Sequence, residues 1–467
     1  MIFKVENLAR IKSAKVELKN LTLFVGQNST HKSYMAHVFY EFYKEVANLK
    51  ENPRALFRFL NTLTKKLHTQ YFKELEYLLS LPNELIEETE SYPVNDNDYE
   101  EELFTILNIS LDFKDKKLVS FLDDLYQQLF IELSKTIDSS FNIQSTILDK
   151  ISIEGSSFLQ EDRELSVIFL DNIDDFSVDK EEIEIRTLNT LIKEMVKKII
   201  TYLEDYHAPY YFPASRTGFV LTLDEIYAGI FRDKFRGQVS ATRLGEPTID
   251  FIQTFADIKT GKINEPLGLS KWRGSLKISN KKQQKLISFL ETNIIKGKIK
   301  EHRNEQDYAS YYLDINGIEL DLHLASSATL ETLPFIVFIK NTEDITKSFF
   351  VIEEPEAHLH PKAQIEMARF IVMLTNSGAK VLVTTHSDYI LNEINNAIKL
   401  FQIDAQNDFA ISDTKIGAYL FKNTLKETQV EKLEIDKFGI ANDNFDEVLD
   451  ELLERSSILS EKILDEK

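Results

Sequence analysis

The spacing of hydrophobic residues at the start of the chain changes at Lys32. Short apolar runs at residues 2–5, 15–18 and 21–25 predict three β-strands, and Gly26 ends the third. From Lys32 onward the apolar residues recur at helical spacing. The chain therefore opens with strands, a short loop and a helix.

The middle of the chain has a different pattern. Residues 51–205 read mainly as amphipathic helices with polar breaks. One break, residues 84–102, holds nine acidic residues and no basic one, so we expect an exposed loop there. Residues 208–222 predict a return to sheet.

Strand patterns dominate the region after residue 310. Alternating apolar residues on both sides of Asn316 and Gly317 predict a hairpin, because both turn residues need φ > 0. Continuous apolar runs at 349–352 and 381–384 are typical of buried parallel strands, and residues 361–376 between them predict the crossover helix.

These elements predict an α/β fold with a parallel sheet, split by a mainly helical insert. We expect an N-terminal lobe at residues 1–50, the insert at 51–205 and the remainder of the domain at 206–467. A final helix is expected to begin near Asn444.

Composition narrows the class of protein. The net charge of -21 excludes a basic footprint over the whole protein, and the absence of cysteine excludes disulfides, thiolate metal sites and cysteine nucleophiles. The longest apolar stretches are far shorter than the ~20 residues that a membrane span needs, and we see no signal peptide. We therefore expect a cytoplasmic protein without a membrane partner.

One stretch reverses the overall charge. Residues 271–303 hold ten Lys or Arg and only two Glu, with Trp272 beside Arg273. Such a stretch can contact nucleic acid or an acidic partner, and it can equally be a solvated helix face.

The loop at residues 26–33, with the sequence GQNSTHKS, lies between a predicted strand and a predicted helix. This is the context of a phosphate-binding loop, in which backbone N–H groups and the helix N-terminus hold anionic oxygens. Lys32 would reach the phosphates and Ser33 would bind Mg²⁺. An ordinary strand-to-helix turn is the alternative, since His31 stands where a second glycine is usual.

Acidic residues follow the predicted strand at 349–352, in the run EEPEAHLHP. Acids at the carboxyl end of a parallel strand point into the crevice where nucleotides bind. Glu353 is placed to hold Mg²⁺ through its water, and Glu354 to polarise an attacking water. A charged surface turn is the alternative. His358 and His360 suggest either packing at an interface or a metal site.

His386 directly follows the next predicted strand, in the run TTHS. A histidine there can donate a hydrogen bond to a terminal phosphate. A lone histidine is otherwise a structural or exposed residue.

The order of these motifs resembles that of ABC-type ATPases of the SMC/RecF/OLD group. The resemblance covers residues 1–50 and 310–425 and hardly touches the insert. It implies an ABC-type nucleotide-binding domain with ATP and Mg²⁺ as ligands. Glu354 would then be the catalytic base, and His386 would sense the γ-phosphate.

In this group a second subunit completes the site with a serine-rich signature that opens a helix. Ser326 matches the serine that contacts phosphate, and the resemblance therefore implies a homo-oligomer, at least a dimer. Ser29, His31 and Ala328 replace glycines, so slow hydrolysis is expected. Arg216 is expected to face the nucleotide or the subunit interface.

The expected site follows from these matches. Catalytic residues are Glu354 and His386, and the metal ligands are Ser33 and Glu353. The nucleotide-binding residues are Gly26, Gln27, Asn28, Ser29, Thr30, His31, Lys32, Ser33 and Ser326.

The resemblance also bears on biological role. No set of acids typical of a Toprim nuclease follows His386, and similar stand-alone ATPases often serve bacterial antiphage systems such as PARIS with a separately encoded effector. We therefore expect a nucleotide-driven switch that controls a separate effector protein. A DNA-repair ATPase similar to RecF or SMC, and a scaffold that binds ATP without hydrolysing it, remain as alternatives.

Overall fold

The computed structural model divides the chain into two compact units. The first comprises residues 1–4, 44–144 and 150–205, and the second comprises residues 5–43, 145–149 and 206–467. The residues that the structure describes are 2–51, 86–88, 104–110, 150–154, 166–172, 208–223, 246–261, 281–441 and 454–459. The three-part division expected from the sequence stays a prediction.

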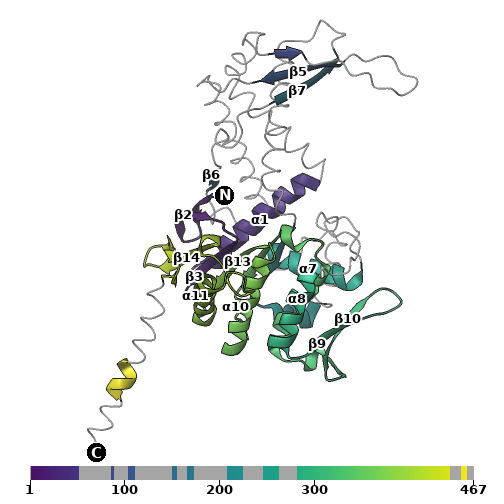
Figure 1. Cartoon of the computed structure of the whole chain (residues 1–467), viewed down its shortest axis with the longest axis vertical. Helices are drawn as coiled ribbons and strands as arrows, with labels where there is room; N and C mark the ends of the chain where they lie inside the picture. Colours follow the sequence, from purple (N-terminus) through teal and green to yellow (C-terminus); the bar gives the residue numbers. More distant parts are fainter. Residues whose placement is uncertain are drawn as a thin grey trace, which may run out of the picture. The chain divides into compact units, whose positions relative to one another are not determined.

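A six-stranded sheet with the order β15-β14-β3-β13-β12-β8 forms the centre of the second unit (Figure 1). Its strands are β3 (Leu21–Gly26), β8 (Ala208–Phe212), β12 (Ser348–Glu353), β13 (Lys380–Thr385), β14 (Ile416–Asn423) and β15 (Thr428–Lys432). Every neighbouring pair is parallel except the β14–β15 hairpin. Burial on both faces explains the continuous apolar runs of β3, β12 and β13. The predicted α/β fold with a parallel sheet is therefore confirmed.

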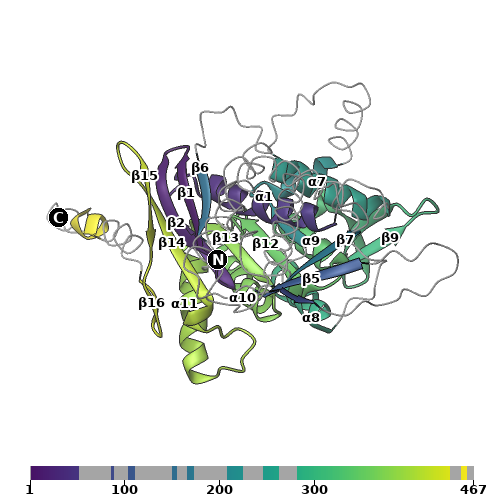
Figure 2. The same cartoon turned by 90° about the horizontal axis from the view of Figure 1, so that it is seen from above.

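Helices connect the parallel strands. They are α1 (Lys32–Glu51), α7 (Glu246–Thr260), α8 (Lys281–Leu290), α9 (Ser327–Asn341), α10 (Pro361–Asn376) and α11 (Asp388–Ile403). Figure 2 shows the start of α1 on one side of β12 and β13, with α10 and α11 on the other. Aromatic pairs hold these layers together: the rings of Phe24 and Phe39 join β3 to α1 at 5.9 Å, and those of Phe212 and Phe335 join β8 to α9 at 4.5 Å. The predicted crossover helix at 361–376 is confirmed.

The parallel arrangement brings three segments of interest to one edge of the sheet. β13 lies between β3 and β12, with Glu353 opposite Thr384 and Thr385 opposite Val25. The phosphate loop, the acidic run and His386 follow the carboxyl ends of these three strands, and they therefore meet there.

The predicted hairpin is also confirmed. β10 (Ala309–Ile315) pairs with β11 (Ile318–Asp321), and the turn residues Asn316 and Gly317 have φ of 54° and 87°. β9 (Lys298–Arg303) pairs with the other side of β10. A π-helix at Glu291–Ile295 links α8 to this small sheet.

The first unit contains an antiparallel sheet of three strands in the order β4-β5-β7. Its strands are β4 (Ile86–Glu88), β5 (Phe104–Ser110) and β7 (Ser166–Asn172). The sequence pattern did not indicate these strands, and β4 falls inside the segment expected to be a loop. The mainly helical character of the insert stays a prediction, because most of its residues lie outside the described ones.

Short elements complete the described chain. They are β1 (Ile2–Leu8), β2 (Ile11–Glu17), β6 (Lys150–Glu154), β16 (Ile435–Asp436), β17 (Gly439–Ile440) and 3₁₀ turns at Leu322–Leu324, Ile345–Lys347 and Asp413–Lys415. The start of the final helix predicted near Asn444 lies outside the described residues. None of the helices in the described ranges has the length and apolarity to cross a membrane.

One strand prediction is partly wrong. Only Ala208–Phe212 form a strand, whereas residues 216–223 are helical. The ring of Phe219 in this helix packs 6.3 Å from that of Phe251 on α7. A tertiary contact therefore overrides the strand-like composition of the segment.

Candidate nucleotide-binding site

The phosphate loop contains two non-glycine residues in the left-handed region, Ser29 at φ 61° and His31 at φ 65°. Left-handed backbone costs an L-residue about 1–2 kcal/mol, so neighbouring groups must hold the loop. At Gly26, which has φ 144°, no side chain fits, because a Cβ there would lie 2.3 Å from the carbonyl oxygen of Phe421 on β14.

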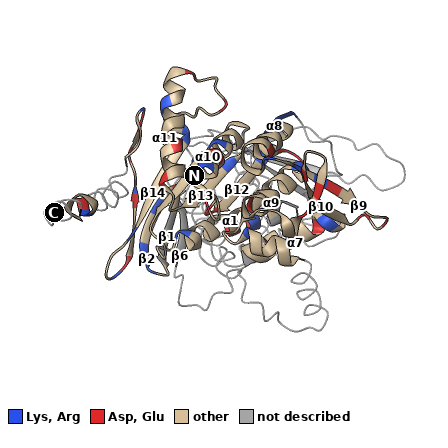
Figure 3. Ribbon diagram, turned by 90° about the horizontal axis from the view of Figure 1, so that it is seen from below, with Lys and Arg blue, Asp and Glu red and all other residues tan. Residues whose placement is uncertain are grey.

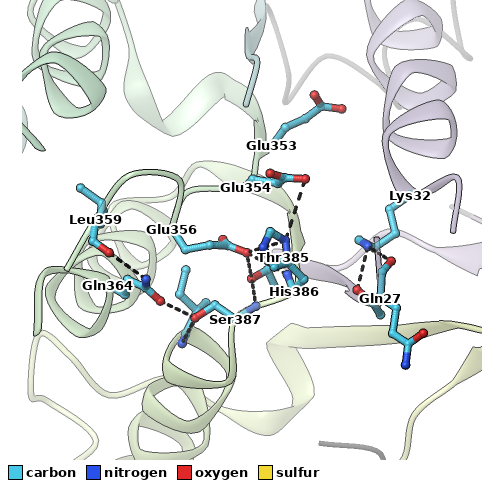
Figure 4. Close-up of polar contacts among 12 residues, drawn as sticks. Gln27, Lys32, Glu353, Glu354, Glu356, Leu359, Gln364, Thr385, His386 and Ser387 are labelled. Carbon is cyan, nitrogen blue, oxygen red and sulfur yellow. Dashed lines mark hydrogen bonds and ion pairs between the residues drawn. The ribbon is translucent and has the colours of Figure 1, made fainter. Parts of the chain in front are cut away.

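Lys32 begins α1 and folds back over the loop. Its Nζ donates to the carbonyl oxygen of Gln27 at 2.7 Å (Figure 4). It also donates to the carbonyl oxygen of Gly26 at 2.8 Å and to Thr30 Oγ1 at 3.2 Å. Burial lowers the pKa of the Lys32 ammonium, against the opposing charges of the three glutamates of the EEPE run. A cation is thus fixed at the centre of the loop, close to those acids.

Ser33 and Glu353, the two predicted metal ligands, lie together. Burial raises the pKa of Glu353, but contacts from His37, Ser33 and Tyr211 outweigh it and leave that pKa below its usual value. His37 Nε2 lies 3.5 Å from Glu353 Oε1 and 2.6 Å from the Tyr211 hydroxyl. Hydroxyl and carboxylate oxygens are donors that Mg²⁺ prefers, so this pair fits the ion.

Glu354, the predicted base, stands just beyond the end of β12. Its backbone has φ 41°, and its N–H donates to the carbonyl oxygen of Thr384 at 2.9 Å. Its side chain remains 33% exposed and lies 3.9 Å from His386 Nδ1. The carboxylate is therefore accessible to water, while the backbone beneath it is fixed.

Arg216 supplies much of that fixation. Its guanidinium donates to the carbonyl oxygens of Glu353 at 2.6 Å and Glu354 at 3.0 Å. Its Nε lies 2.9 Å from Glu331 Oε2 on α9, and both side chains have 0% exposure. The expectation that Arg216 faces the nucleotide or the interface is therefore wrong: Arg216 is a buried residue that ties α9 to the backbone of the two acids.

Glu356 organises the turn that carries His386. Its Oε1 accepts hydrogen bonds from Thr385 Oγ1 and from the backbone N–H of His386, both at 2.8 Å (Figure 4). The same oxygen lies 3.3 Å from His386 Nδ1. The ring of His386 is thus held next to Glu354.

Ser326 lies apart from this group. It is the N-cap of α9, where its Oγ accepts from the N–H of Thr329 at 3.3 Å, and its side chain is exposed. In the described residues its hydrogen bonds join it to its own helix and not to the phosphate loop. Its role across a subunit boundary stays a prediction.

In the described part of the basic stretch, some of the cations pair with acids. Lys300 pairs with Asp314 at 3.2 Å, and Arg303 pairs with Glu301 at 2.7 Å. Figure 3 accordingly shows both signs of charge along β9 and β10. Residues 271–280 lie outside the described residues.

The metal site suggested by His358 and His360 has no support among the described residues. No group of three or more His, Asp or Glu there could hold a metal ion, and both histidines are exposed.

Three residues of the site were not expected from the sequence. His37 lies four residues after Ser33, and this spacing puts both on one helix face, which is a signal that could have found it. Glu356 is the third acid of the EEPE run. Tyr211 gives no such signal, since an aromatic residue in a strand reads as core.

No curated protein matches the chain. Similar solved structures include an SMC head bound to the C-winged helix domain of ScpA, with 12% identity, a TM-score of 0.33 and coverage of 93% of this chain and 98% of that one. The SMC head domain from Thermotoga maritima has 8% identity, a TM-score of 0.31 and the same coverage. A head domain with an extended coiled coil, bound to the C-terminal domain of ScpA derived from Pyrococcus furiosus, has 11% identity, a TM-score of 0.32 and coverage of 99% and 98%. Similarities this low bear neither on fold nor on function.

A family match is much more informative. The sequence profile described as AAA ATPase domain matches residues 1–391, which is most of the chain and includes Lys32, the EEPE run and His386. The chain therefore belongs to the AAA ATPase domain family.

Proposed function

We propose that the chain binds ATP at residues 26–33 and hydrolyses it slowly with Glu354 as the base. The observation that carries this proposal is the convergence of Lys32, Glu353, Glu354 and His386 at one edge of the sheet. Membership of the AAA ATPase domain family supports ATP as the nucleotide.

Binding rests on the loop and the start of α1. The Lys32 ammonium neutralises phosphate charge, and the free N–H groups at the N-terminus of α1 donate to phosphate oxygens. Ser33 and Glu353 would hold Mg²⁺, which supplies further charge neutralisation when bound.

Hydrolysis requires a base and a group that responds to the terminal phosphate. Glu354 accepts a proton from the attacking water, and His386, held by Glu356, donates a hydrogen bond to the γ-phosphate. Slow turnover follows from the side chains of Ser29 and His31, which occupy loop positions where glycine allows closer approach to phosphate.

The test is phosphate release by the purified protein with Mg²⁺ and ATP. Glu354→Gln keeps the shape of the side chain and removes the base, so turnover should fall about 10²–10⁴-fold while ATP still binds. Glu305→Gln, at an exposed turn, is the matched control and should have no effect. Wild-type turnover in Glu354→Gln would remove Glu354 from the mechanism.

We also infer an ABC-type assembly in which a second copy completes the site. The exposed Ser326 at the N-terminus of a 15-residue helix is suited to contact the phosphate bound by another subunit. Such an ATP-dependent dimer would act as a switch for a separately encoded effector, and bacterial antiphage defence is the setting we propose.

Light scattering with and without ATP tests this assembly. Ser326→Arg should abolish ATP-dependent association and turnover, because it places a bulky cation at the subunit boundary. The monomer should keep its melting temperature. A variant that still associates and turns over normally would contradict the composite site.

A further inference from the structure

The C-terminal hairpin β14–β15 lies directly beside the phosphate loop, although it falls outside the residues matched by the family profile. β14 is the neighbour of β3 in the sheet, and Phe421 is paired with Gly26, the first residue of the loop. The hairpin therefore begins its turn next to the loop.

Two hydrogen bonds connect the hairpin to the loop, and a third, within the hairpin, links them. Thr428 Oγ1 donates to Asn423 Oδ1 at 2.8 Å, so His31 Nδ1, at 3.2 Å, must be the donor to that hydroxyl. Asn423 Nδ2 in turn donates to the carbonyl oxygen of Ser29 at 3.1 Å. The chain of bonds starts at one left-handed residue of the loop and ends at the other.

The hairpin tip is itself anchored. The N–H of Thr428 donates to the carbonyl oxygen of Arg10 at 2.8 Å, and Arg10 donates to that of Thr424 at 2.9 Å. Lys12 pairs with Glu427 at 2.9 Å. Thr428 is 2% exposed. A fixed support, rather than a loose turn, thus contacts the loop.

We propose that Asn423 and Thr428 are positioning residues that hold Ser29 and His31 in the phosphate-binding conformation. In this chain, hydrogen bonds from the hairpin replace the conformational freedom that glycines would give the loop. This inference rests on the proposed ATP site at residues 26–33.

Calorimetric titration of the full-length protein with Mg²⁺ and ATP tests the inference. Asn423→Ala should weaken ATP binding about 3- to 10-fold, as expected for the loss of one supporting hydrogen bond. Thr428→Val should do the same, since it removes the hydroxyl and keeps the shape. Gln429→Ala is the matched control, because Gln429 lies on the same hairpin and its side chain, among the described residues, bonds to Glu427 and not to the loop; it should leave the affinity unchanged.

A rescue distinguishes positioning from general damage. Glycine adopts positive φ without strain, so Ser29→Gly should make the loop less dependent on Asn423. Adding Asn423→Ala to Ser29→Gly should then change the affinity less than about 2-fold. Melting temperatures of the variants without nucleotide should stay near that of the wild type.

The outcomes separate the two proposals. If Asn423→Ala and Thr428→Val bind ATP like the wild type while Lys32→Ala does not, the hairpin has no positioning role and the ATP site stands. An equal loss from Asn423→Ala with and without Ser29→Gly would also overturn the inference. If Lys32→Ala binds ATP normally, the site itself is wrong, and the inference fails with it.

Discussion

The phosphate loop and the acidic end of β12 lie at the same edge of the sheet but are held in different ways. The loop is supported by hydrogen bonds with the uncharged side chains of Asn423 and Thr428, of which Asn423 is exposed. The acidic end is held by Arg216, whose charge is balanced by Glu331 where neither side chain reaches solvent. One support is polar and near water, and the other is ionic and buried.

The two regions differ in what balances their cations, Arg216 and Lys32. An ion buried without water is costly unless it is paired, so Arg216 and Glu331 depend on each other. Among the described residues, the hydrogen bonds of the Lys32 ammonium go to carbonyl and hydroxyl oxygens of the loop, and the glutamates of the EEPE run act on it without a direct ion pair, so its charge can still meet an anionic ligand. We therefore expect substitutions in the buried support of the acidic end, Arg216 and Glu331, to affect folding, and substitution of Lys32 in the loop to affect binding.

Arg216→Met should have the largest effect. It leaves the Glu331 carboxylate buried without its cation and removes donors from the carbonyl oxygens of Glu353 and Glu354. The free energy of unfolding should fall by about 3–5 kcal/mol, measured by urea denaturation.

A second arginine provides the control for Arg216→Met. Arg369 pairs with Glu366 and Glu393, but its side chain is 37% exposed, so Arg369→Met should cost at most about 1 kcal/mol. Combining Arg216→Met with Glu331→Leu should recover part of the loss, because no buried charge is then unpaired. If Arg216→Met and Arg369→Met lowered the free energy of unfolding equally, the distinction between the buried and the exposed arginine would be wrong.

Lys32→Ala should show the opposite behaviour. ATP binding should weaken about 10- to 100-fold, as expected for lost bonds to a charged ligand, while the free energy of unfolding changes by less than about 1 kcal/mol. Calorimetry and urea denaturation of the same protein measure both. Lys281→Ala is the control, since Lys281 likewise begins a helix but is exposed, and it should alter neither quantity. A large loss of stability in Lys32→Ala would show that the loop charge also serves the fold.

Burial explains which parts of this molecule the sequence could predict. β3 and β12 are buried throughout and β13 in all but its first residue, whereas the helix between β12 and β13 is buried on one side; this burial determines the apolar patterns that were used to predict them. The order of strand, loop and helix then located the phosphate loop, and strand ends located Glu354 and His386.

The supports of the site were not predictable in the same way. Arg216 and Glu331 are far apart in the sequence, as are Asn423 and Ser29, and a single long-range polar contact leaves no periodic pattern. Arg216 was singled out, but it was expected to face the nucleotide or the subunit interface, because nothing in the pattern around it showed that Glu331 would lie beside it. A buried ion pair of this kind can be identified only from the folded structure.

Ser29→Gly should have the smallest effect and tests the loop side of the comparison most directly. Glycine removes the cost of φ 61° but gives the unfolded chain more freedom, and these two contributions oppose each other. The free energy of unfolding should therefore change by less than about 1 kcal/mol in urea denaturation, and ATP should still bind. Ser412→Gly is the control at φ −68°, where no strain is relieved and the bond from the N–H of Thr414 to Ser412 Oγ is lost, so that variant should be destabilised. A loss above about 2 kcal/mol in Ser29→Gly would mean that the serine side chain, and not the backbone held by Asn423, maintains the loop.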